Sequence, residues 1–91
     1  MKTLRVFISG AVQGTFFRKF IEDSAKRIGV RGFVRNLDDG RVEVVIEGRE
    51  DKIDEMLKAC QGEGYSHANV KDVKIEELKY QGFEGFKITR L

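Results

Sequence analysis

Five short stretches of the chain place apolar residues at every second position or close to it, and each predicts a strand. In the first stretch Leu4, Val6 and Ile8 alternate with polar residues, and Phe7 is the one apolar exception. The stretches cover residues 3–9, 31–36, 41–47, about 70–79 and about 83–90. An Asp-Gly pair at 39–40 separates the second from the third, which predicts a hairpin.

Two other segments repeat their apolar residues at the helical period. The first runs from about Phe17 to Ile28 and ends at Gly29, a typical helix stop. The second covers residues 51–61 and begins with acidic residues that suit a helix dipole. The resulting order, βαββαβ plus a fifth strand, predicts an α+β fold of the ferredoxin-like kind. Both helices should cover one face of an antiparallel sheet in which the first two strands run parallel.

Composition limits the class of protein further. A chain of 91 residues predicts one domain, residues 1–91. Lysine and arginine number 17 against 15 acidic residues, without a basic block, so neither nucleic acid nor an anionic membrane is an expected partner. Cys60 is the single cysteine, which excludes an internal disulfide and a cysteine-rich zinc site. The N-terminal segment is too polar for a signal sequence or a membrane span, and we expect a cytoplasmic monomer.

The segment between the first strand and the first helix carries the clearest chemical signal. Gly10 and Gly14 allow unusual backbone dihedrals just before a helix N-terminus, where unpaired N–H groups can form a nest for an anion. Arg18 follows in the first helical turn, about 100° round the helix from Phe17, so its guanidinium can reach the same anion. A plain tight turn beside a surface arginine explains the same residues equally simply.

Two motifs in this region resemble the signatures of the acylphosphatase family. The first consists of Ile8, Gly10, Val12-Gln13-Gly14, Phe17 and Arg18. The second consists of Gly32-Phe33-Val34-Arg35-Asn36, then Gly40, Val42 and Gly48. The chain departs from the usual pattern at Ala11, Thr15, Leu37 and Gly62-Glu63-Gly64. The resemblance spans the whole chain, including the final Gly85-Phe86-Lys87-Ile88.

The resemblance implies an enzyme that hydrolyses acyl phosphates to a carboxylate and inorganic phosphate. Because the sequence shows no cluster of metal ligands and Arg18 with backbone donors can neutralise phosphate, we expect neither a metal nor another cofactor. Inorganic phosphate is then both product and competitive inhibitor. The implied catalytic residues are Arg18 and Asn36, with Asn36 orienting the attacking water. The implied phosphate-binding residues are Val12, Gln13, Gly14, Thr15, Phe16, Phe17 and Arg18. From its position alone, Asn36 could equally be a turn former at the start of the hairpin connection.

Other candidate residues and functions have weaker support. His67 is the single histidine and lies in a polar loop, and Cys60 falls on the apolar stripe of the second helix. The acidic run that begins at Glu50 lacks the spacing of a calcium loop. An RNA-binding module shares the element order, and Arg31-Gly32-Phe33 begins like its aromatic motif, but Val34 and Arg35 break the match. A small-ligand-binding module of similar fold is a further alternative.

Overall fold

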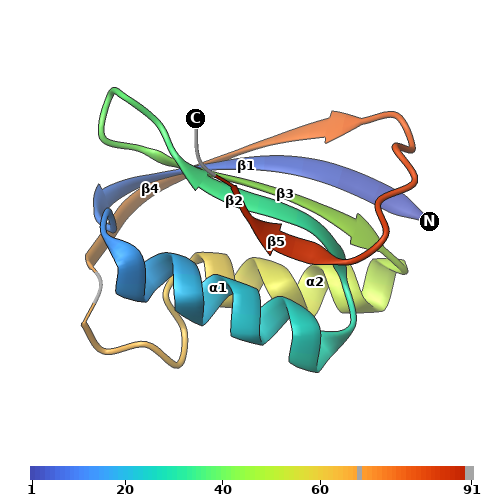
Figure 1. Cartoon of the computed structure of the whole chain (residues 1–91), viewed down its shortest axis with the longest axis horizontal. Helices are drawn as coiled ribbons and strands as arrows, with labels where there is room; N and C mark the ends of the chain where they lie inside the picture. The colour runs from blue at the N-terminus through green and yellow to red at the C-terminus, as the bar shows by residue number, and fades with distance from the viewer. Residues whose placement is uncertain (68, 90–91) are drawn as a thin grey trace.

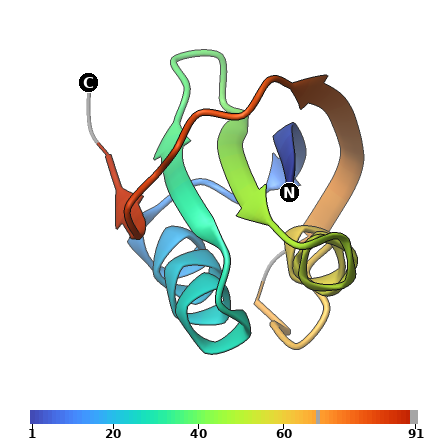
Figure 2. The ribbon, with the colours of Figure 1, turned by 90° about the vertical axis from the view of Figure 1, so that its right-hand side faces the viewer.

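The predicted elements form a five-stranded sheet with two helices on one face. The computed structural model describes residues 1–67 and 69–89. The elements are β1 (Lys2–Ala11), α1 (Thr15–Ile28), β2 (Arg31–Asn36), β3 (Val42–Gly48), α2 (Glu50–Cys60), β4 (Asn69–Leu78) and β5 (Phe86–Ile88). Both helices lie below the sheet in Figure 1, and the end-on view of Figure 2 shows the two layers. The ferredoxin-like α+β prediction is confirmed.

The order of the strands brings the carboxyl ends of β1 and β2 to one edge of the sheet. The sheet has the order β4-β1-β3-β2-β5. Because β1 and β2 both run antiparallel to β3, which lies between them, they are parallel to each other. Their carboxyl ends, after Ala11 and Asn36, therefore lie at the same edge. The sheet is otherwise antiparallel except for the β2–β5 pair, which is parallel.

The last strand is shorter than its apolar pattern predicts. The expected strand at 83–90 is wrong in extent, because β5 covers only Phe86–Ile88; residue 90 lies outside the described residues. Gly82 and Gly85 have φ values of 76° and 143°, which interrupt an extended strand. The N–H of Phe83 donates to Glu47 Oε1 at 3.0 Å, so the backbone at Phe83 is hydrogen-bonded to a side chain rather than to a neighbouring strand.

A single apolar cluster fills the space between the sheet and the helices. The buried residues from the helices are Phe17, Ile21, Ala25 and Ile28 of α1 and Ile53, Met56, Ala59 and Cys60 of α2. They pack against valines, isoleucines and leucine of β1, β2 and β3. Cys60 belongs to this core, and burial raises the pKa of its thiol to about 12. A thiol with that pKa stays protonated at neutral pH and is a poor nucleophile.

The central strand β3 is buried on both faces, and two of its buried residues are glutamates. Glu43 is 4% exposed, and its carboxylate forms ion pairs with Arg5 and Arg35. Glu47 is 1% exposed and accepts hydrogen bonds from Thr3 and from the chain that precedes β5. Buried charges need such partners because desolvation is costly. The face of the sheet away from the helices is therefore covered by charged side chains and by the β4–β5 connection.

Candidate active site

The β1–α1 connection forms an uncapped helix N-terminus. Gly14 occupies the N-cap position of α1 with φ 113°, and no side chain caps the helix there. The first turn contains no acidic residue. The N–H groups of this turn carry the positive end of the helix dipole, which favours an anion at this position.

The two glycines of this connection have different structural roles. A Cβ atom on Gly10 would lie 2.1 Å from the carbonyl oxygen of Asn69, so this glycine allows β1 to approach β4 closely. The β1–β4 register shifts between Ser9 and Gly10. A Cβ atom on Gly14 would meet no described atom within 4 Å, so this position requires glycine for its positive φ and not for space.

Arg18 folds back over the loop from the first turn of α1. Its Nε donates a hydrogen bond to the carbonyl oxygen of Gly14 at 3.3 Å. Within residues 1–67 and 69–89, no ion pair involves this guanidinium. The Nε contact orients the group, while its Nη atoms retain donors that suit two oxygens of a phosphate.

The side chain of Gln13 ties the loop to the β2–β3 hairpin. Its Nε2 donates to the carbonyl oxygen of Leu37 at 2.8 Å and to that of Arg41 at 3.2 Å. The N–H of Leu37 in turn donates to the Arg41 carbonyl at 2.8 Å. Gln13 can therefore offer an anion only its backbone, because its side chain is already engaged. Sequence reasoning missed this tether, since backbone acceptors leave no signal in the residue type.

Register places Asn36 beside this loop. Val42 of β3 pairs with Ile8 of β1 on one side and with Asn36 of β2 on the other. Residues directly opposite each other on neighbouring strands point to the same face of a sheet. Ile8 and Val42 are fully buried in the core, so Asn36 faces the helices from the edge where α1 begins.

Asn36 also has an unused acceptor. Its Oδ1 atom is buried, yet it has no hydrogen-bond partner among the described residues. Buried polar atoms are nearly always paired, so this unpaired acceptor at the edge of the sheet is available to a bound water or ligand.

The remaining candidates divide into core and surface. Val12 is 1% exposed and anchors the loop in the core, whereas Thr15 and Phe16 are exposed. His67 is exposed and packs edge-on against Tyr65, with ring centroids 5.7 Å apart. Within the described parts of the chain, no three His, Cys, Asp or Glu side chains are grouped as metal ligands, and no helix is long and apolar enough to cross a membrane.

Comparison with known proteins assigns the family. The acylphosphatase family model matches residues 4–88. The chain belongs to the acylphosphatase family. It is 48% identical over 85 residues to the acylphosphatase of Haloquadratum walsbyi, covering 93% of this chain and 90% of that one. It is 45% identical over 87 residues to that of Pseudomonas aeruginosa, covering 96% and 94%.

A solved structure gives the same assignment. The crystal structure of acylphosphatase from Bacillus subtilis superposes with a TM-score of 0.91 at 33% identity, covering 99% of this chain and 100% of that one. The resemblance expected from the two motifs is confirmed, and so is acylphosphatase as the enzyme class of this chain.

Proposed function

We propose that residues 12–18 hold the phosphoryl group of an acyl phosphate while Asn36 positions the water that attacks it. The products are a carboxylate and inorganic phosphate. The observation that carries this proposal is the convergence at one sheet edge of an uncapped helix N-terminus, Arg18 and the unpartnered Oδ1 of Asn36. Each group supplies something different to the reaction.

The loop and Arg18 supply positive charge. Phosphoryl transfer passes through a loose transition state in which negative charge spreads over the peripheral oxygens. Donors already fixed in place stabilise that charge without reorganising. The proposed backbone donors belong to Gln13, Gly14, Thr15, Phe16 and Phe17, with the side chain of Val12 fixing the loop from the core. The Nη groups of Arg18 complete the cradle.

Asn36 supplies geometry. Its amide is too weak a base to deprotonate water, but Oδ1 can accept a hydrogen bond from it and so direct the oxygen lone pair at phosphorus. The new P–O bond forms as the bond between phosphorus and the acyl oxygen breaks. The bonding electrons leave with the carboxylate, which needs no proton from the protein. The water proton passes to a phosphate oxygen.

The same arrangement leads us to propose metal-independent catalysis, because Arg18 and the amides supply the charge that a divalent ion would otherwise bring. Inorganic phosphate fits the same cradle and should inhibit competitively.

We further propose a cytoplasmic monomer of one domain. The described residues share one apolar core, which supports the single domain. Among the described residues, the exposed large apolar side chains are Met1, Phe16, Ile75 and Tyr80, which come from separate parts of the chain.

On the sheet face that an RNA-binding module would use, the aromatic rings of Phe7 and Phe33 are already engaged. Phe33, the residue that would stack on a base, packs edge-on against Phe83 with ring centroids 5.9 Å apart. The guanidinium of Arg41 covers the ring of Phe7 on the same side of the sheet, 4.7 Å from its centroid. Both aromatic rings therefore already have partners within the chain.

Two variants test the division of roles between Arg18 and Asn36. Arg18→Ala should weaken phosphate inhibition and also raise the barrier to turnover by about 3 kcal/mol or more. The reason is that the positive charge of Arg18 is lost in both the ground state and the transition state. Asn36→Ala should reduce turnover by about a hundredfold while the inhibition constant for phosphate changes only a few-fold. Arg27→Ala, which removes an exposed arginine at the other end of α1, is the matched control and should change neither. Equal loss of phosphate affinity in the first two variants would refute the division.

A further inference from the structure

An open groove of about 640 Å³ lies along the outer side of α1, beside the proposed phosphate site. Its lining residues are Phe16, Lys19, Phe20, Asp23, Tyr65 and His67. Those from α1 recur at the spacing of one helix face, and the other two come from the connection between α2 and β4. The volume is typical of a small-molecule site.

The floor of the groove is a set of aromatic rings held by the core. Tyr65 stacks on Phe20, with centroids 4.9 Å apart and planes 29° from parallel. Tyr65 also meets the edge of Phe17, at 5.9 Å, and Phe17 is only 3% exposed. His67 packs against Tyr65 from the outer side. Because a buried ring fixes the exposed ones, the surface is preorganised for a flat ligand.

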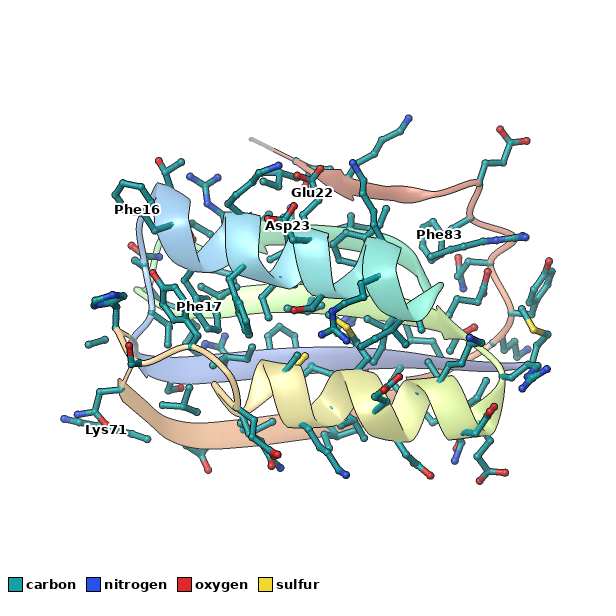
Figure 3. The ribbon with its side chains drawn as sticks, turned by 90° about the horizontal axis from the view of Figure 1, so that it is seen from below. Phe16, Phe17, Glu22, Asp23, Lys71 and Phe83 are labelled. Carbon is teal, nitrogen blue, oxygen red and sulfur yellow. The ribbon has the colours of Figure 1, made fainter. Side chains whose placement is uncertain are left out.

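The groove begins at the loop itself. Phe16 lines it and lies within the segment proposed to bind phosphate, two residues before Arg18. Phe16 is 78% exposed, which leaves most of its large apolar ring open to a ligand. Figure 3 shows Phe16 at the start of α1 pointing outward, while Phe17 lies on the side of the helix that faces α2. A group attached to the bound phosphate would therefore meet the ring of Phe16 first.

Lys19, the cation on the groove lining, is paired with carboxylates. Lys19 Nζ lies 3.2 Å from Asp23 Oδ1 and 3.3 Å from Glu22 Oε1. The cation on the lining is thus neutralised by carboxylates on the same helix. A groove of this kind favours an uncharged, apolar occupant over one that carries a further carboxylate.

We infer that this groove binds the acyl group of the substrate and selects flat aromatic acyl groups over short aliphatic ones. The inference rests on the proposed phosphate site, because the phosphoryl group on the loop determines where the acyl group begins. In the groove, the aromatic ring would pack against the exposed ring of Phe16 throughout the reaction. It would leave with the carboxylate once the bond between phosphorus and the acyl oxygen has broken.

The test compares kcat/KM for benzoyl phosphate with kcat/KM for acetyl phosphate in the same enzyme preparation. Phe16→Ala should lower this ratio by about tenfold, the scale of a lost apolar contact in a specificity pocket. His67→Ala, which lies outside the phosphate loop, should lower it by about threefold, the scale of one aromatic contact. Tyr80→Ala removes another exposed aromatic side chain, 63% exposed and outside the groove, and should leave the ratio unchanged.

The outcomes separate this inference from the proposed phosphate site. Wild-type ratios in both Phe16→Ala and His67→Ala, with both substrates still hydrolysed, would overturn the groove as the acyl site and leave the phosphate site intact. Arg18→Ala should reduce kcat/KM for both substrates by the same factor, because both carry the phosphoryl group. A ratio that falls in the two groove variants and holds in Tyr80→Ala supports the inference, even if the overall rate of a variant is low.

Discussion

The buried carboxylate of Glu47 should contribute heavily to the stability of this fold. Its Oε1 accepts from the N–H groups of Gly82 and Phe83, each at 3.0 Å. Its Oε2 accepts from the N–H of Gln81 at 2.7 Å and from the hydroxyl of Thr3. One side chain thus joins β1, β3 and the connection that leads to β5.

Glu47→Gln tests this role with almost no change in shape. The amide keeps one acceptor oxygen. Its NH₂ group faces the two donors that were hydrogen-bonded to the second carboxylate oxygen of Glu47. Each buried donor left without an acceptor costs about 1–3 kcal/mol. The hydroxyl of Thr3 can rotate to accept from the new NH₂, which leaves the N–H of Gln81 unpaired, so we expect a loss of about 1–3 kcal/mol in the free energy of unfolding. For a chain of this size that corresponds to a fall in Tm of about 4–24 °C.

Urea and thermal unfolding at pH 7, followed by circular dichroism, measure this loss. The matched control is Glu50→Gln, whose carboxylate pairs with Lys2 at 3.4 Å and is 75% exposed. Such a surface pair should change stability by about 0.5 kcal/mol or less. The reasoning is refuted if Glu47→Gln is as stable as the wild type.

The pH dependence gives a second measurement on the same pair of proteins. Burial disfavours the ionised form of Glu47, but hydrogen bonds from Thr3 and from three backbone amides outweigh it and hold its pKa below the usual 4.5. A lowered pKa in the folded state stabilises the fold above pH 4.5, and this contribution is lost as the pH falls through the folded-state pKa. The stability gap between wild type and Glu47→Gln should therefore narrow on acidification. A gap that widens would contradict the assignment of the charge to Glu47.

Three further predictions concern the site and the core. Gln13→Ala removes two hydrogen bonds from the loop tether, about 1 kcal/mol each, and should raise the inhibition constant for phosphate by about tenfold; a change under twofold would show that the loop is ordered without it. Cys60→Ala should lower the free energy of unfolding by about 1 kcal/mol or more and leave kcat intact, whereas loss of turnover in a folded variant would indicate a thiol nucleophile. Prolonged EDTA treatment should leave the rate unchanged, and activity that disappears and returns with magnesium or zinc would contradict a charge supplied by Arg18.

Sequence predicts most of the fold because its hydrophobic periods are clean. The α1 stripe of Phe17, Ile21, Ala25 and Ile28 is buried as its spacing indicates, and Gly29 ends the helix in the left-handed conformation. The parallel placement of β1 and β2 also follows from the element order. This is enough to bring the loop and Asn36 to one edge of the sheet.

What the sequence does not predict depends on contacts between distant residues. A glutamate at an alternating position, such as Glu47, normally indicates a solvent-exposed face, and its amide partners lie 34 to 36 residues away in a connection without regular structure. The same amides explain why β5 begins only at Phe86, although Phe83 continues the apolar pattern. The tether from Gln13 is hidden for a similar reason, since its acceptors are main-chain carbonyls.

The central claim is that the β1–α1 loop binds the phosphoryl group, and backbone amide chemical shifts test it most directly. Inorganic phosphate would be titrated into the ¹⁵N-labelled protein, with Arg18→Ala as the weakened comparison. The account predicts that the largest saturable shifts fall on the amides of residues 13–18, and that the same amides need a higher phosphate concentration in the variant. Largest shifts elsewhere in the chain, with residues 13–18 unmoved at saturation, would contradict it.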